Sequence, residues 1–231
     1  MGRVIAIGDI HGCASEFAEL LNRINPQSDD VIIQIGDMVN RGPDSAAVLR
    51  IIRENNIRAI LGNHERRLLE FRWRRDASIL KKYDAETIEQ LTPKDWEFLE
   101  NLPLFFYNSD LQTVFVHGGF DPHSPVLWRE QPASVVTTIQ VIDQEGKPSK
   151  RSKAPEGRDW GDLWQGPPFV VYGHTPRQEV RSHPQAIGID TACVYGGMLT
   201  ACILPEQELI QVNAHEVYAQ SKTLPQPVNI Q

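Results

Sequence analysis

The sequence predicts an α/β fold, and three features of the chain support this prediction. Two apolar runs that end at glycine, residues 3–8 and 31–36, are typical of strands buried on both faces. Each run is followed by a segment with apolar residues at helical spacing, residues 14–24 and 45–55. From residue 113 onward, apolar runs with short connections indicate further strands.

The first half of the chain is predicted to alternate strands and helices. Residues 14–24 present one apolar face and have Ser15 near their start, where a helix-capping side chain is favoured. Residues 57–62 form a third predicted buried strand. Residues 64–102 are predicted to be helical, with a break at Pro93 because the residue before a proline disfavours helical geometry.

The second half is predicted to consist mainly of strands, at residues 113–119, 168–174, 186–190, 199–204 and 208–212. Residues 120–168 hold prolines, glycines, three of the five tryptophans and a polar run, and we interpret them as an elaborated surface insertion. We therefore expect one domain over residues 1–218 and a loosely held tail over residues 219–231.

Composition excludes several classes of function. The chain has 231 residues, 23 Lys and Arg against 30 Asp and Glu, and a net charge of −7, which disfavours a general nucleic-acid or membrane-surface binder. No apolar run approaches the roughly 20 residues of a membrane span, and the first residues lack a signal-peptide pattern. Three irregularly spaced cysteines, Cys13, Cys193 and Cys202, indicate reduced thiols. These features predict a cytoplasmic location.

Polar residues follow five of the predicted strands at the point where each ends. The motifs GDIHG, GDMVNRG, GNHE, VHGG and YGHT place these side chains: Asp9, His11, Asp37, Asn63, His64, His117 and His174. Open α/β sheets bind their ligands beyond the carboxyl ends of the strands, so we expect these side chains to converge there.

This set of oxygen and nitrogen donors suits a first-row divalent metal better than calcium. Seven positions exceed the four ligands of a closed zinc site and favour two metals that share a carboxylate. Any one motif alone is more simply explained as a turn or a core histidine. The occurrence of GDIHG, GDMVNRG and GNHE in this order, each after a buried strand, favours the metal site.

These motifs resemble those of the calcineurin-like metallophosphoesterase superfamily, over nearly the whole chain apart from the insertion and the tail. The resemblance is strongest to the branch that holds PPP-type serine/threonine protein phosphatases and symmetrical diadenosine tetraphosphatases. The segments NRGPDS, LGNHERRLLEF and DTACVYGGMLTA resemble the tetraphosphatases in particular. The family fold is a β-sandwich flanked by helices, so the resemblance implies that fold here.

The resemblance also implies a ligand set. One metal would be held by Asp9, His11 and Asp37, and Asp37 would bridge to a second metal held by Asn63, His117 and His174. A hydroxide that bridges the two metals would attack phosphorus in line. Manganese is the expected metal, and iron, cobalt, zinc, nickel or magnesium also suit these ligands.

Three further residues match functional positions of the family. His64 corresponds to the general acid that protonates the leaving oxygen, and Arg41 to an arginine that clamps phosphate. Asn40 stands where the protein phosphatases have an aspartate that bonds the acid histidine. We expect the carbonyl of Asn40 to accept a bond from His64, with a lower pKa of His64 than an aspartate would give. This favours a leaving group that needs little proton assistance.

We therefore predict hydrolysis of dinucleoside polyphosphates, such as diadenosine tetraphosphate to two ADP. The alternative is a PPP-type protein phosphatase that acts on phosphoproteins, and a remote alternative is a non-catalytic binding scaffold. No membrane partner and no general nucleic-acid binding are expected.

Several other residues leave more than one interpretation open. A second phosphate contact is expected from Arg151, Arg158 or Arg177, and the sequence does not choose among them. The tryptophans of the insertion either stack on a base or pack the loop, with packing favoured.

Structural roles are favoured for several other side chains. The arginine-rich residues 65–76 are expected to form a solvated helix face, with a minority role in attracting anions. Asp190 and Tyr195 follow a predicted strand and either reach the site or form a turn, with the turn favoured. The remaining histidines are expected at the surface: His123, His183 and His215.

Overall fold

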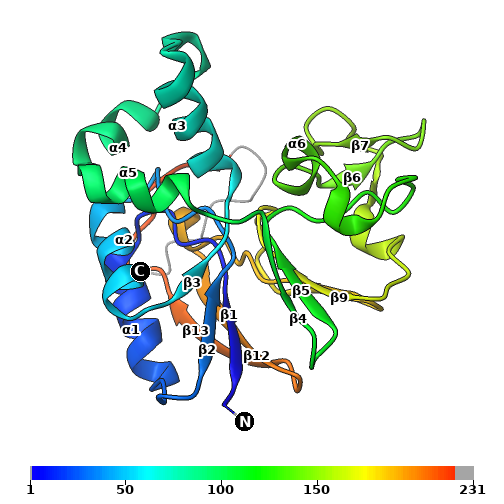
Figure 1. Cartoon of the computed structure of the whole chain (residues 1–231), viewed down its shortest axis with the longest axis horizontal. Helices are drawn as coiled ribbons and strands as arrows, with labels where there is room; N and C mark the ends of the chain where they lie inside the picture. Colours follow the sequence, from blue (N-terminus) through cyan, green and yellow to red (C-terminus); the bar gives the residue numbers. More distant parts are fainter. Residues whose placement is uncertain (1, 222–231) are drawn as a thin grey trace, which may run out of the picture.

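Two five-stranded sheets pack face to face in the computed structural model, which describes residues 2–221 (Figure 1). The first sheet has the order β13-β12-β1-β2-β3 and contains β1 (Val4–Ile7), β2 (Val31–Gln34), β3 (Arg58–Ala59), β12 (Met198–Leu204) and β13 (Glu208–Asn213). The second has the order β10-β11-β9-β5-β4 and contains β4 (Phe105–Asn108), β5 (Thr113–Val116), β9 (Phe169–Tyr172), β10 (Arg181–His183) and β11 (Ala186–Gly188).

Helices cover the outer face of the first sheet and the end of the sandwich. The outer face packs against α1 (Ala14–Ile24) and α2 (Ser45–Glu54). Three further helices follow β3: α3 (Asn63–Arg74), α4 (Asp84–Gln90) and α5 (Pro93–Glu100), with the short 3₁₀ turn η1 (Ala77–Ile79) between α3 and α4. The predicted β-sandwich flanked by helices is confirmed.

Strand alternation divides the core into layers. In β1, Val4 and Ala6 belong to the apolar cluster between the two sheets, whereas Ile5 and Ile7 pack toward α1 and α2. Successive side chains of a strand point to opposite faces, so a strand buried on both sides needs an unbroken apolar run. The run Val4–Ile7 meets this requirement, because all four residues are buried.

The insertion covers the outer face of the second sheet. It forms a small antiparallel sheet, order β7-β6-β8, and three short helical turns: β6 (Val141–Ile142), β7 (Pro148–Ser149), β8 (Arg158–Asp159), η2 (Trp128–Glu130), α6 (Ala133–Val136) and η3 (Trp160–Asp162). Trp160 is only 1% exposed and packs with Val116 and Tyr172 of that sheet. Trp128 lies edge-on to Phe105, with ring centroids 5.1 Å apart. These contacts support the packing interpretation of the tryptophans.

Secondary structure differs from the sequence prediction in three places. The predicted strand 57–62 is wrong in length, because β3 pairs over two residues and the amide of Leu61 then bonds Pro103. The predicted helical region 64–102 also breaks near residue 75, where Arg75 takes a left-handed φ of 56° and ends α3. The edge strands β4 and β10 were not predicted. The sequence of β10 lacks an apolar run, and the aromatic run of β4 directly follows the predicted helical region.

The described chain ends against the core of the first sheet. Ala219 is buried and its amide bonds the carbonyl of Val194, at the start of the segment expected as a tail. Residues 222–231 of that expected tail lie outside the described residues. The three cysteines are free thiols and are buried. Among the helices of residues 2–221, none combines the length and the apolar composition that a membrane crossing requires.

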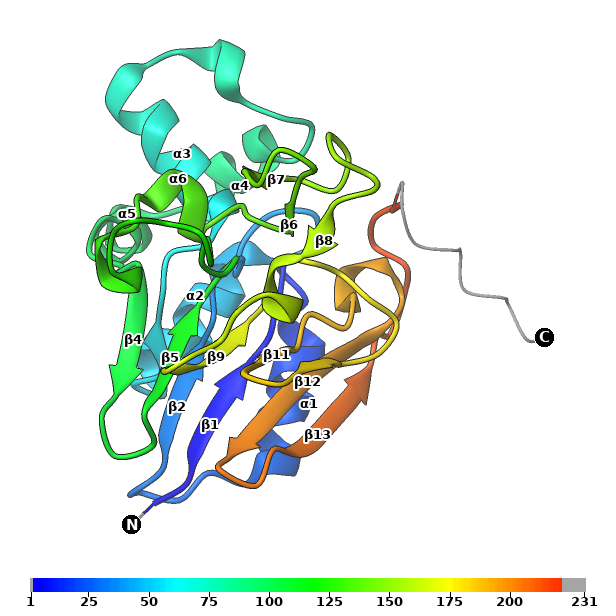
Figure 2. The same cartoon turned by 90° about the vertical axis from the view of Figure 1, so that its right-hand side faces the viewer.

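Figure 2 shows where the strand ends that carry the predicted ligands lie. The carboxyl ends of β1, β2, β5 and β9 lie at the same end of the sandwich, and α3, α4 and the small sheet stand beyond them. Both sheets therefore contribute to one site.

Candidate active site

Asp37 lies at the centre of the cluster that forms beyond these strand ends. Nε2 of His11 is 3.5 Å from one of its carboxylate oxygens, and Nε2 of His117 is 3.3 Å from the other. Asp37 therefore belongs to two groups of donor atoms within 4.8 Å of one another, one with His11 and His64 and one with His117 and His174.

The other two predicted ligands join the same cluster. Asn63 Oδ1 is 3.2 Å from Nε2 of His117, and Asp9 Oδ2 is 3.9 Å from Nε2 of His11. Asp9 also accepts the backbone amide of His174, at 3.1 Å, which ties β1 of one sheet to β9 of the other. The fold thus brings together all six side chains that the sequence proposes as ligands.

Backbone carbonyls orient three of the histidines. Nδ1 of His11 lies 3.0 Å from the carbonyl of Val39, and Nδ1 of His117 lies 2.9 Å from that of Ile35. Nε2 of His174 lies 3.1 Å from the carbonyl of Thr138. A carbonyl can only accept, so the proton of each neutral ring sits at that nitrogen and the other nitrogen keeps its lone pair for a metal.

The charges of the cluster favour bound cations. Burial, together with the nearby carboxylates of Asp190 and Asp37, raises the pKa of Asp9 well above its usual value. Burial lowers the pKa of His117, but Asp37, Asp9 and Glu65 outweigh burial and raise it to about 10. Burial lowers the pKa of His11 and of His174 to about 3, so these two rings stay neutral and keep a free lone pair. Buried carboxylates that attract positive charge, beside neutral imidazoles, are a donor set that suits divalent metals.

The backbone around the cluster is held in an uncommon conformation. His11, Asp37 and His174 have left-handed φ angles of 48°, 55° and 65°. Such angles cost a non-glycine residue roughly 1–3 kcal/mol and persist where surrounding contacts enforce them. A Cβ on Gly173 would stand 2.1 Å from Oδ1 of Asp9, so only glycine lets β9 approach this carboxylate.

Glu65 provides many of the hydrogen bonds that hold this backbone conformation. Its Oε1 accepts the amides of Met38 and Val39 at 2.8 and 3.1 Å, and its Oε2 accepts those of Asp37 and Gly62 at 3.0 and 3.1 Å. Burial and then Asp37 raise its pKa to about 7. The expectation of a solvated face is wrong for Glu65, which is fully buried. Its position three residues after Gly62, where a helix-capping glutamate sits, was the available signal.

The hydrogen bond between Asn40 and His64 runs in the opposite direction to the one expected. The amide nitrogen of Asn40, not its carbonyl, lies 2.9 Å from Nδ1 of His64. The same nitrogen donates to Asp84 at 2.9 Å, and Asp84 forms an ion pair with Arg67 at 2.6 Å. Burial lowers the pKa of His64 well below its usual value, and Asp37 raises it only in part. Arg67, three residues after His64 on α3, also approaches Nδ1 of His64, at 3.2 Å. Asp84 acts on His64 through Asn40 and Arg67, and only the tertiary fold brings it there.

Arg41 stands beside the cluster. Its Nη1 lies 2.5 Å from Nε2 of His11, and its guanidinium lies 5.4 Å from the ring centre of Tyr195. Tyr195 lines the pocket and Asp190 is buried near Asp9, so both reach the site, which is the alternative that the sequence left open. The loop after β11 returns them to the strand ends, which the sequence alone does not reveal.

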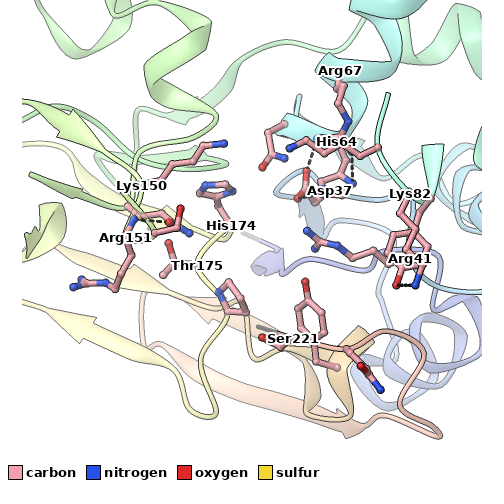
Figure 3. A pocket seen from close by; sticks show the side chains of 18 of the residues that line it. Asp37, Arg41, His64, Arg67, Lys82, Lys150, Arg151, His174, Thr175 and Ser221 are labelled. Carbon is pink, nitrogen blue, oxygen red and sulfur yellow. Dashed lines mark hydrogen bonds and ion pairs between the residues drawn. The ribbon is translucent and has the colours of Figure 1, made fainter. Parts of the chain in front are cut away.

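The cluster opens into a pocket of about 840 Å³ (Figure 3). Asp37 is the only carboxylate among its described lining residues, against seven basic side chains: Arg41, Arg67, Lys81, Lys82, Lys150, Arg151 and Arg177. Figure 3 shows Lys150 and Arg151 across the opening from Arg41 and Lys82. A pocket of this charge binds anions in spite of the acidic chain.

The structure distinguishes the three arginines that were candidates for a second phosphate contact. Arg151 and Arg177 line the pocket, whereas Arg158 is exposed on β8 and is not among its lining residues. Arg151 and Arg177 both bond Asp159.

The expectation of a surface position is wrong for His183, whose side chain is buried and bonds Tyr172 at 2.8 Å and Asp162 at 2.7 Å.

Comparison with known proteins agrees with this geometry. Residues 2–213 match the family model described as calcineurin-like phosphoesterase. The asymmetrical bis(5'-nucleosyl)-tetraphosphatase PrpE of Oceanobacillus iheyensis is 29% identical, with 95% of this chain and 96% of the relative covered. The protein of the same name from Bacillus cereus strain ATCC 10987 is 30% identical, with 95% and 97% covered.

Solved structures show the same fold. The crystal structure of a proposed diadenosine tetraphosphatase superposes with a TM-score of 0.81 at 32% identity, covering 92% of this chain and 94% of that one. A protein serine/threonine phosphatase from Saccharomyces cerevisiae has a TM-score of 0.58 at 16% identity, covering 97% and 81%, and shares the fold. From its family model and its relatives, this chain belongs to the calcineurin-like phosphoesterase family.

Proposed function

We propose that the chain is a dinuclear metal-dependent hydrolase that cleaves dinucleoside tetraphosphates. The observation that carries this proposal is the pocket, where a cluster of donors that could hold metal ions opens between seven basic side chains and a single carboxylate, counted over the described lining residues. A substrate with several phosphates suits that charge distribution better than a single phosphoryl group. The names of the relatives support the same class of substrate.

One ion would be held by Asp9, His11 and Asp37, and the other by Asp37, Asn63, His117 and His174. When bound, such a pair polarises phosphoryl oxygens and supplies an acidified water as the nucleophile. The free ring nitrogens and the shared position of Asp37 support this assignment. Manganese remains the metal we propose.

The remaining residues orient the substrate. Arg41 would bind non-bridging phosphate oxygens with its planar fork, and its contact with the ring of Tyr195 holds that fork at the pocket wall. His64 would donate a hydrogen bond from Nε2 to the leaving oxygen. A nucleotide leaves as a stable phosphate anion, so a hydrogen bond from a neutral ring is sufficient and complete proton transfer is not needed.

We further propose asymmetrical cleavage, in which diadenosine tetraphosphate and water give ATP and AMP. The sequence alone predicts the symmetrical products, two ADP. The relatives are named asymmetrical enzymes, and for that reason the asymmetrical products replace the symmetrical ones in our proposal. The name that the relatives share supports the asymmetrical position of cleavage. The metal cluster is compatible with either position.

A substrate panel tests the proposal. The manganese-loaded protein is offered diadenosine tetraphosphate, a phosphoserine peptide and para-nitrophenyl phosphate, and products are separated by chromatography. We expect the dinucleotide to have the highest kcat/KM and to yield ATP and AMP in equal amounts. Turnover of the phosphopeptide alone would establish the protein phosphatase alternative, and ADP as the only nucleotide would restore symmetrical cleavage. A variant with Asp37→Asn serves as the control for contaminating phosphatases.

A further inference from the structure

We propose that Lys81 and Lys150 form a second anion subsite at the rim of the pocket, which binds phosphates of the chain beyond the one that reacts. This inference rests on the proposed function for its substrate and names the part of the pocket that recognises a polyphosphate. The two lysines come from distant parts of the sequence and line the same pocket.

Position separates this subsite from the metal cluster. Asp37 at the centre of the cluster is 2% exposed, whereas Lys81 is exposed and Lys150 half-buried. The cluster therefore forms the floor of the pocket and the lysines its rim. Lys150 stands across the opening from Arg41 and Lys82, with Asp37 and His64 between them in the view (Figure 3).

Both lysines sit on anchored backbone. The amide of Lys81 donates to Asp84 Oδ2 at 2.7 Å, just before α4 begins. The carbonyl of Lys150 accepts the amides of Lys153 and Ala154 at 2.9 and 3.0 Å, in the turn that follows β7. The side chains thus extend from fixed points on opposite elements, the α3–α4 connection and the insertion.

The contacts of the basic residues single out these two lysines. Arg41 lies 2.5 Å from Nε2 of His11 and is assigned to the reacting phosphate. Arg151 and Arg177 share Asp159, and Arg67 is paired with Asp84. The ammonium of Lys82 donates a hydrogen bond to the hydroxyl of Tyr83, at 3.3 Å. Within residues 2–221, by contrast, neither the ammonium of Lys81 nor that of Lys150 has an ion pair or a hydrogen bond with a side chain. They are free to bind an anion, while the paired arginines are held by structural carboxylates.

Electrostatic repulsion supports the same conclusion. Burial and then the charge of Lys81 lower the pKa of Lys150. Partial burial and then Arg67 lower the pKa of Lys81, although Asp84 opposes this effect. Unpaired like charges gathered around one opening are relieved by a polyvalent anion. An extended polyphosphate chain, with its reacting phosphate at the metal cluster, supplies negative charge at the rim; a single phosphoryl group does not.

The test compares two substrates in matched double variants. Lys81→Gln/Lys150→Gln removes both rim charges, and Lys94→Gln/Lys153→Gln removes two exposed lysines from α5 and from the same turn as Lys150. In the manganese-loaded rim variant, we expect kcat/KM for diadenosine tetraphosphate to fall at least tenfold more than for para-nitrophenyl phosphate, mainly through KM. The control variant should keep the wild-type ratio. An unchanged ratio in the rim variant would overturn the subsite.

A binding measurement keeps this inference separate from the proposed function. Inorganic tripolyphosphate is titrated calorimetrically into the metal-free full-length protein, so that the probe cannot extract the metal. We expect the rim variant to bind about tenfold more weakly than the wild type and the control variant. Equal binding by all three proteins would refute the subsite even if dinucleotide hydrolysis is found. Weaker binding by the rim variant would sustain an anion subsite even if the natural substrate is another polyphosphate.

Discussion

The side-chain amide of Asn40 donates a hydrogen bond to Asp84 at 2.9 Å. The same nitrogen lies 2.9 Å from Nδ1 of His64. Because an ionised carboxylate can only accept, Asp84 determines that the amide presents its NH₂ group to the ring. The proton of a neutral His64 is therefore held at Nε2, the nitrogen that lies 3.9 Å from Asp37.

This relationship predicts that a substitution at Asp84 partly compensates for one at Asn40. Asn40→Asp would place two buried carboxylates where an amide now bonds one, and we expect it to lower the free energy of unfolding by about 2–4 kcal/mol. Adding Asp84→Asn returns one amide and one carboxylate in exchanged positions. The double variant should be more stable than the sum of the single effects by at least about 1 kcal/mol. Urea unfolding of the metal-free proteins measures this coupling.

Glu86→Gln is the matched control for this cycle, since Glu86 is exposed on the same helix as Asp84. Combined with Asn40→Asp it should give no recovery. Strictly additive effects of Asn40→Asp and Asp84→Asn would show that the two side chains do not act as a pair.

Arg41→Lys keeps the charge but removes the planar fork and its packing on Tyr195. We expect kcat/KM for the dinucleotide to fall by about 10- to 100-fold, with stability little changed. Steady-state kinetics measure the fall, and Arg50→Lys on the exposed side of α2 is the control. If Arg41→Lys and Arg50→Lys are equally active, Arg41 does not clamp phosphate.

Gly173→Ala tests the close approach of β9 to Asp9. Its methyl group would lie 2.1 Å from Oδ1 of Asp9, so the carboxylate must move. We expect weaker manganese binding by calorimetry and a loss of about 100-fold in kcat, with the circular dichroism spectrum retained. Gly146 has a left-handed φ of 81°, so Gly146→Ala strains its own turn, but its methyl group meets only His123, at 3.7 Å, and manganese binding should match that of the wild type. Normal manganese binding by Gly173→Ala would remove Asp9 from the metal site.

Asp30 gives a prediction on pH that does not involve the site. Hydrogen bonds from Arg3 lower the pKa of Asp30 to about 2, so its carboxylate stabilises the fold above pH 4 and loses this effect as the pH falls toward 2. Asp30→Asn should cost about 1 kcal/mol at pH 7, a modest value because Arg3 is partly exposed. The difference from the wild type should shrink between pH 4 and pH 2 in urea unfolding. Asp29→Asn, at an exposed neighbour, should show no such trend.

The sequence located the strand ends and the donor residues because both are local signals. Buried strands such as Val4–Ile7 need unbroken apolar runs, and the polar residue and glycine that follow mark where the chain leaves the sheet. The six proposed ligands could therefore be found without the structure. Their convergence follows from the parallel arrangement of β1 with β2 and of β5 with β9.

The supporting contacts could not be found in this way. Asp84 lies 44 residues from Asn40 and begins a short helix whose sequence resembles any solvent-exposed turn. Tyr195 reaches Arg41 only after the chain has crossed to the other sheet and returned. Edge strands such as β10 are half-exposed and carry no apolar run, so pairing with β11 defines them. Such features depend on tertiary contacts that no sequence window contains.

Asp37 is the residue on which the central claim depends, because both groups of donor atoms contain it. The direct measurement is the number of manganese ions bound per chain, determined by elemental analysis after reconstitution and gel filtration. The account predicts two ions for the wild type and fewer than one for Asp37→Asn, with loss of dinucleotide hydrolysis. A single ion in the wild type, or two ions retained by an active Asp37→Asn protein, would contradict a dinuclear centre built on this carboxylate.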